Sequence, residues 1–200
     1  MLEGYFDAQF SSRGSESTAA KIAAHITALK ELYVLECVSG WDAPVRSKSR
    51  VRTKPKYYFA DPSLAATLLQ VTPERLLEDG QLLGMLFESL AMHDLAVYTD
   101  ALPEASSKGL HYYRDSDGLE VDAIIELRSG KWAGIEIKLG DNKWLEGAKA
   151  LNRLRKKIAL NPAARNPKPA FMAVLVGAGE VARYDEQEDV YIIPLTALGA

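Results

Sequence analysis

Two runs of alternating side chains, separated by a short polar stretch, constrain the fold of this chain more than any other feature. They occupy residues 119–127 and 132–139 and flank Arg128-Ser129-Gly130-Lys131, whose glycine suits a tight reversal. Successive side chains of a strand point to opposite faces, so every second residue shares a face. The sequence therefore predicts a β-hairpin in which Asp122, Glu136 and Lys138 converge on one surface.

These three residue types have a chemical meaning in this arrangement. Two carboxylates on adjacent strands can hold a hard divalent cation such as Mg²⁺, which prefers oxygen ligands and keeps several waters. A lysine two residues beyond the second carboxylate could orient a water or neutralise charge on a phosphate. The alternative is the solvated face of an amphipathic hairpin. The same face also carries Ile124, Trp132 and Gly134, so it is not a simple exposed face.

The spacing of Asp122 and Glu136-Ile137-Lys138 resembles the D…(D/E)-x-K signature of the restriction-endonuclease-like superfamily. With Tyr112-Tyr113-Arg114 and Glu120-Val121 it is also similar to a bacterial and archaeal domain of unknown function. That domain usually lies C-terminal to an AAA-type ATPase module. The resemblance implies a PD-(D/E)xK nuclease-like fold and an ATPase module as partner.

The first 75 residues have a different pattern. A helix beginning at Ser17 or Thr18 and ending near Lys30, strands at 33–38 and 54–61, and a helix beginning near Pro62 are expected. This order resembles the later part of a winged-helix unit, so residues 1–75 are interpreted as a partial winged-helix-like segment. The segment between the strands is basic and would be a wing touching phosphates or a solvated hairpin tip, and the negative net charge favours the tip; its candidate contacts are Arg46, Lys48, Arg50 and Arg52.

A helix is predicted from about Gln81 to Leu95, after a boundary at residues 71–80. Glu88 lies on the same helical stripe as Gly84, Ala91 and Met92. An acid in that setting costs free energy unless it is paired or binds a metal. The resemblance implies that Glu88 reaches the metal site, and a surface glutamate at the edge of the stripe is the alternative.

A second long helix is predicted after the hairpin, from about Lys143 to Leu160, followed by strands at 170–176 and 191–194. Its polar side carries Lys149 and Arg153, which would meet a phosphate backbone or form a solvated basic face. Hairpin, helix, strand and strand predict an α/β sandwich with a mixed sheet. The restriction-endonuclease-like superfamily uses this arrangement, so the resemblance implies that residues 80–200 are a PD-(D/E)xK nuclease-like domain.

Composition narrows the class of protein. A formal net charge of −3 over 200 residues gives no global basic signature for non-specific nucleic-acid binding. The single Cys37 excludes an internal disulfide, no apolar run approaches the roughly 20 residues of a membrane span, and the N-terminus lacks a secretory pattern. A cytoplasmic protein is expected, with no membrane partner and an oligomeric state that the sequence does not indicate.

No Walker loop occurs, so an ATP site of that kind is not expected.

Two functions follow from the patterns above. The first function is a Mg²⁺-dependent nuclease in which Asp122, Glu136 and Glu88 hold the metal and Lys138 assists the attacking water. The second is a non-catalytic module that recognises nucleic acid or a protein beside an ATPase, with Lys138 paired to the carboxylates. A dimerisation scaffold is a weaker third interpretation.

Overall fold

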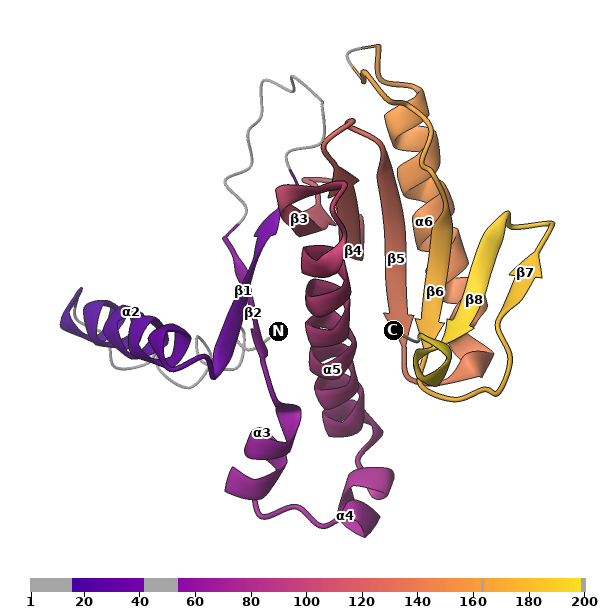
Figure 1. The fold of residues 1–200 in the computed structure, drawn as a ribbon. Coiled ribbons are helices and arrows are strands. Elements are labelled where there is room, and N and C mark those ends of the chain that lie inside the picture. Colours follow the sequence, from indigo (N-terminus) through magenta and orange to yellow (C-terminus); the bar gives the residue numbers. More distant parts are fainter. Residues whose placement is uncertain (1–15, 42–53, 163, 199–200) are drawn as a thin grey trace. The chain divides into compact units, whose positions relative to one another are not determined.

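The computed structural model describes residues 16–41, 54–162 and 164–198, and Figure 1 traces their helices and strands. These residues form two compact units. The first comprises the described residues up to Val38 together with Pro55–His93, and the second comprises the described parts of Ser39–Lys54 and Asp94–Ala200. The predicted mixed α/β class is confirmed. The predicted division into residues 1–75 and 80–200 stays a prediction.

The first unit contains helices around a two-stranded ladder. Its elements are α2 (Glu16–Glu31), most of β1 (Leu35–Gly40), β2 (Lys56–Phe59), α3 (Pro62–Leu68), α4 (Pro73–Glu78) and the first part of α5 (Gly80–Ala101). β1 and β2 pair antiparallel. The expected succession of helix, strand, strand and helix is confirmed, and α4 is an addition to it. Arg46, Lys48, Arg50 and Arg52, the predicted wing contacts, lie outside the described residues.

Side-chain caps fix where the two short helices of the first unit begin. Asp61 Oδ1 accepts a hydrogen bond from the backbone N–H of Ser63 at 2.8 Å, and Thr72 Oγ1 accepts one from Arg75 at 3.4 Å. A proline follows each cap, where the missing N–H costs no helical hydrogen bond. Cap and proline together therefore set the starts of α3 and α4.

The second unit is built on a mixed sheet. Its strands lie in the order β3-β4-β5-β6-β8-β7 and are β3 (Ala105–Arg114), β4 (Glu120–Leu127), β5 (Trp132–Lys138), β6 (Met172–Val176), β7 (Arg183–Asp185) and β8 (Val190–Pro194). Strands β3, β4 and β5 form an antiparallel meander, whereas β5, β6 and β8 are parallel to one another. The end of β1, Ser39–Gly40, pairs parallel with His111 and Tyr112 of β3. The 3-10 turns are η1 (Asp141–Lys143) and η2 (Leu195–Ala197).

Helix α6 (Trp144–Ala159) covers the face of β5 and β6 that carries Glu136. Leu151, Leu154 and Ile158 of α6 are fully buried and join a cluster with Ile124 and other sheet residues. The connection from β5 through α6 to parallel β6 is the crossover that a parallel pair requires. Within the described residues, no helix has the length and apolar character to cross a membrane.

Gly130 at the hairpin turn and Gly84 in α5 are expected to respond oppositely to alanine. Gly130 has a φ of +77°, and a Cβ there would lie 2.7 Å from Asn166 Nδ2, so Gly130→Ala should lower the free energy of unfolding by about 1–2 kcal/mol. A Cβ at Gly84 meets nothing within 4 Å, so Gly84→Ala should raise it by up to about 1 kcal/mol. Chemical denaturation measures both, and an unchanged Gly130→Ala protein would contradict the turn geometry.

Candidate metal and acid–lysine site

The β4–β5 hairpin brings the predicted trio together. Gly130 turns the chain, and the ladder sets Ala123 opposite Ile135 and Ile124 opposite Gly134. Continuing this register by one residue sets Asp122 opposite Glu136. Directly opposed residues share a face, so the face expected from the alternation is the face that the structure has.

The contacts within the trio are short. Lys138 Nζ lies 2.6 Å from Glu136 Oε2 and 3.9 Å from Asp122 Oδ2. Asp122 Oδ2 also accepts a hydrogen bond from the backbone N–H of Ile137 at 2.9 Å. This bond ties the Asp122 side chain to the neighbouring strand and fixes its orientation beside Glu136.

Glu136 is buried because α6 approaches β5 closely at this point. Gly147 of α6 leaves room for it, since a Cβ at that position would lie 3.1 Å from Glu136 Cβ and 3.2 Å from Val174. Gly134 allows a similar approach of Leu151. As a result the Glu136 side chain is 5% exposed, against 23% for Lys138 and 17% for Asp122.

Burial and neighbouring charge disfavour the ionised form of Glu136. Burial raises its pKa from 4.5 to about 8, and the negative charge of Asp122 acts in the same direction. The charge and hydrogen bond of Lys138 oppose the rise without cancelling it. Glu136 is therefore a carboxyl group whose ionised form calls for more positive charge than Lys138 supplies.

This donor set suits a hard divalent cation. Two carboxylates on neighbouring strands, one buried and one partly open to solvent, match the one or two carboxylates through which Mg²⁺ is usually held, the remaining positions being water or phosphate. Within the part of the chain that the structure describes, no three His, Cys, Asp or Glu side chains gather as a metal cluster. The two carboxylates therefore fit a metal site whose remaining ligands are waters and a substrate.

A family model for a domain of unknown function, DUF4143, matches residues 83–198, more than half of the chain and the whole of this hairpin. The chain belongs to this family. A model for a second domain of unknown function, DUF8612, matches residues 7–75. The expectation of a family of unknown function is thereby confirmed.

Two curated proteins are similar in sequence to this chain. They are the uncharacterized proteins Mb2031c of Mycobacterium bovis and Rv2008c of Mycobacterium tuberculosis, each 29% identical over 142 residues. The matched segment covers 69% of this chain and 30% of each relative. The chain thus spans less than a third of the length of the relatives that it matches.

The other predicted site residues that the structure describes lie on helices. Glu88 lies on α5 in the first unit, where its Oε1 accepts a hydrogen bond from the Tyr58 hydroxyl at 3.2 Å. Lys149 and Arg153 are exposed on α6. The role of Glu88 as a metal ligand stays a prediction.

A second polar cluster lies in the same unit as the hairpin. Asp115 Oδ1 accepts hydrogen bonds from the backbone N–H groups of Asp117 and Leu119 and so forms a turn. Unforeseen is Lys157 of α6, whose Nζ lies 2.6 Å from a carboxylate oxygen of each of Asp115 and Asp117. These hydrogen bonds raise the pKa of Lys157. No local signal couples residue 157 to a turn some 40 residues earlier.

Proposed function

We propose that the second unit carries a Mg²⁺-dependent phosphodiesterase site of the PD-(D/E)xK type that acts on nucleic acid. The observation that carries the proposal is the convergence of Asp122, Glu136 and Lys138 around one buried carboxyl group. The sequence of hairpin, covering helix and parallel strand is the arrangement used by the restriction-endonuclease-like superfamily, and it supports the assignment.

Each residue of the trio has a distinct role in this proposal. Asp122, held by the Ile137 N–H, and Glu136 would ligate the metal, and Glu136 would release its proton to do so. The metal, when bound, would supply charge stabilisation and an activated water. Lys138 would then leave its ion pair with Glu136 and donate hydrogen bonds to the attacking water or to a phosphate oxygen. Glu88 would assist directly or through a water.

We further propose that the chain acts with an AAA-type ATPase module. The sequence contains no Walker loop of its own, and its match covers only 30% of each longer relative. A nuclease-like module that depends on a separate ATPase module would have both properties.

A second candidate function is a non-catalytic recognition module. It is favoured by the ion pair of 2.6 Å between Lys138 and Glu136, which gives the buried carboxylate a partner without any metal. In this case the trio would hold β4 and β5 together and would bind nothing. The two candidates differ in whether the trio takes up a cation.

Calorimetric titration with Mg²⁺ and Mn²⁺ is the experiment that tests the proposal. Asp122→Asn keeps an oxygen acceptor for the Ile137 N–H but removes a charge, so we expect metal affinity to fall at least tenfold and metal-dependent cleavage of plasmid or single-stranded DNA to be lost. Glu104→Gln removes an exposed carboxylate beside Arg128, at the turn end of the hairpin, and should leave both unchanged. Wild-type protein that binds neither ion at millimolar concentration would sink the catalytic proposal and leave the recognition module.

A further inference from the structure

The solvent-facing side of α6 carries three cations in one stripe. Lys149, Arg153 and Lys156 are spaced as i, i+4 and i+7, so they lie along one helix face over about 10 Å. All three are exposed, and none makes a hydrogen bond or ion pair with another described residue. Like charges at this spacing repel each other, so the stripe lowers helix stability slightly and is not explained by packing.

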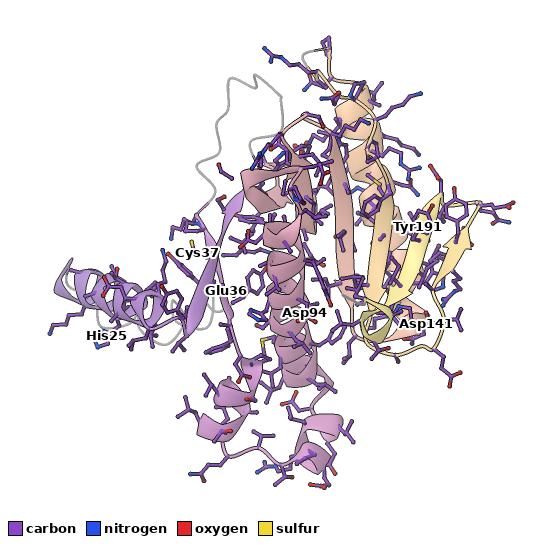
Figure 2. All side chains as sticks on the ribbon, in the orientation of Figure 1. His25, Glu36, Cys37, Asp94, Asp141 and Tyr191 are labelled. Atoms are coloured by element: carbon purple, nitrogen blue, oxygen red, sulfur yellow. The ribbon has the colours of Figure 1, made fainter. Side chains whose placement is uncertain are left out.

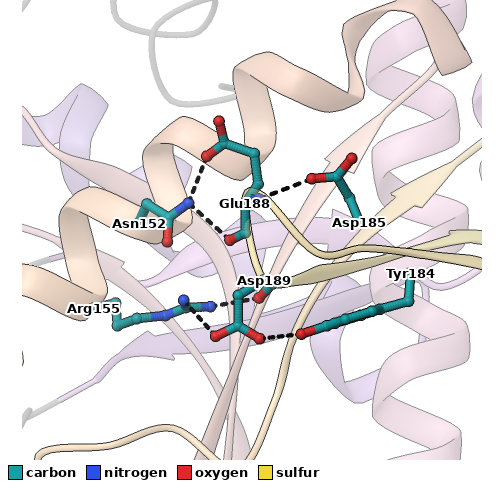
Figure 3. A network of polar contacts seen from close by, with 6 residues as sticks. All are labelled: Asn152, Arg155, Tyr184, Asp185, Glu188 and Asp189. Carbon is teal, nitrogen blue, oxygen red and sulfur yellow. Dashed lines mark hydrogen bonds and ion pairs between the residues drawn. The ribbon is translucent and has the colours of Figure 1, made fainter.

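An open pocket of about 510 Å³ lies against this stripe. Its second wall is the turn between β7 and β8, and its lining is Lys149, Asn152, Arg153, Arg155, Lys156, Gln187, Glu188 and Asp189. The two acidic side chains in the lining are hydrogen-bonded to other side chains of the lining. Asn152 Nδ2 donates to Glu188 Oε2 at 2.8 Å, and Arg155 donates to Asp189 Oδ2 at 2.7 Å (Figure 3). Glu188 keeps its charge because Asn152 is neutral, but the lining has four cationic side chains against two acidic ones, so the pocket keeps a net positive charge.

Three aromatic side chains form a ridge on the same β7–β8 hairpin and the adjoining start of β6. Tyr184 and Tyr191 are cross-strand partners with ring centroids 5.0 Å apart, and Phe171 lies 6.5 Å from Tyr191. They are 48%, 45% and 42% exposed respectively. Figure 2 labels Tyr191 on β8. Large rings left this open at neighbouring positions are a surface on which a flat apolar group can pack.

The pocket wall and the aromatic ridge share one residue. Asp189 receives the guanidinium of Arg155 on one oxygen and the hydroxyl of Tyr184 on the other (Figure 3). Because Asp189 holds both side chains, the cationic pocket and the ridge are fixed relative to each other. Val174 faces Gly147 of α6 and pairs with Ile192, whereas Tyr191 pairs with the preceding Ala173. The rings therefore lie on the sheet face opposite α6, and a ligand that touches both the stripe and the rings must pass around the β7–β8 edge.

We propose that this edge of the second unit binds single-stranded nucleic acid that passes around the β7–β8 hairpin, with phosphates of one part of the strand on the α6 stripe and bases of another part on the aromatic ridge. Phosphate groups are the strong anions that three exposed cations attract, and bases stack on aromatic rings with little regard to sequence. A single strand is flexible enough to bend around this edge and leaves its bases open, whereas a duplex is stiff and its bases are covered by their own stacking and pairing. The inference rests on the proposed function, for which it names the substrate class.

Fluorescence anisotropy with a labelled 20-nucleotide oligothymidylate, in EDTA and at several salt concentrations, tests the inference on the full chain. The Glu136→Gln protein is measured in parallel, and a duplex of the same length is the competitor. Two triple variants of equal charge change are compared: Lys149→Gln/Arg153→Gln/Lys156→Gln, and as the control Lys21→Gln/Lys30→Gln/Lys131→Gln, whose lysines are exposed elsewhere.

We expect the stripe triple variant to lose about 10- to 100-fold in affinity at 0.1 M salt, and the slope of log affinity against log salt to become shallower by about 2. Tyr191→Ala should lose about fivefold or more with the salt slope unchanged, and Phe171→Ala provides a second test of the ridge. The control triple variant should stay close to wild type. The single strand should bind at least tenfold more tightly than the duplex.

Several results would overturn the inference: no binding of the oligonucleotide, equal losses in the two triple variants, equal affinity for duplex, or ridge variants that bind as wild type. Binding in EDTA separates this inference from the proposed chemistry. A Glu136→Gln protein that binds the strand, beside a wild type that binds no metal and never cleaves, would refute the phosphodiesterase and leave the strand-binding surface standing.

Discussion

The free energy of unfolding of the metal-free protein is expected to fall as the pH rises from about 5 to about 8, and Glu136→Gln is expected to remove most of that fall. Burial and the charge of Asp122 raise the pKa of Glu136 from 4.5 to about 8. Between these two values the unfolded chain has released the proton while the folded protein retains it. Each step up in pH in this window therefore favours the unfolded chain.

The expected size of this effect is large for a single side chain. A rise of this extent in the pKa corresponds to an upper limit of about 5 kcal/mol, lost progressively across the window. Because glutamine cannot ionise, the variant should be less stable than or similar to wild type near pH 5 and more stable near pH 8. Guanidinium denaturation in EDTA at several pH values measures the difference between the two proteins.

Two controls sharpen this experiment. Glu104→Gln, which removes an exposed carboxylate, should keep the wild-type fall. Saturating Mg²⁺ should reverse its sign, because a bound cation stabilises the ionised carboxylate and binds better as the proton leaves. Parallel curves for wild type and Glu136→Gln in EDTA would mean that Glu136 is ionised in the folded protein over the whole window.

The alternation of side chains was enough to predict the hairpin and the face that Asp122, Glu136 and Lys138 share. A period of two leaves little freedom once the turn is located, and Gly130 located it. The elements that were missed lack such a pattern. β3 begins at Ala105 through a stretch with two serines and a glycine, and β7 has three residues that form a strand by pairing with β8.

The predicted start of a helix agrees with the structure where the capping residue was recognised in the sequence. The predicted start near Pro62 is where α3 begins, but the stretch around Pro73 was interpreted as a boundary although Thr72 caps α4 there. α5 continues to Ala101, beyond the predicted end near Leu95. A capping residue followed by a proline thus occurs both at the start of a short helix and in a loop, and tertiary packing decides which of the two forms.

The burial of Glu136 could not be predicted from the sequence. It depends on Gly147, which stands in a different element and lets α6 close over β5. The sequence predicted the helix that contains Gly147, but not which strand residue this glycine would face. The raised pKa of Glu136 follows from that contact, so the feature that makes the trio unusual comes from tertiary packing.

Replacing Lys138 by methionine is expected to separate the two proposed functions of the trio. In the phosphodiesterase, Lys138 competes with the metal for Glu136 and later assists the water. Lys138→Met should therefore bind Mg²⁺ as tightly as wild type or more tightly, while cleavage falls by about 10²- to 10⁴-fold. In the recognition module, Lys138 only gives a buried carboxylate its hydrogen-bond partner, so its loss should cost about 1–3 kcal/mol of stability near pH 8 and no metal should restore it.

The measurements are calorimetry, cleavage rates and denaturation on one set of proteins, with Lys131→Met as the matched control. Lys131 is exposed next to the hairpin turn, so its removal changes the net charge equally without touching the trio. Unchanged cleavage in Lys138→Met would exclude a catalytic lysine even if metal binds. Tighter Mg²⁺ binding together with lost cleavage would show that one side chain holds the buried carboxylate before the metal arrives and acts on the substrate afterwards. That double role would explain why Lys138 lies 2.6 Å from the Glu136 carboxylate.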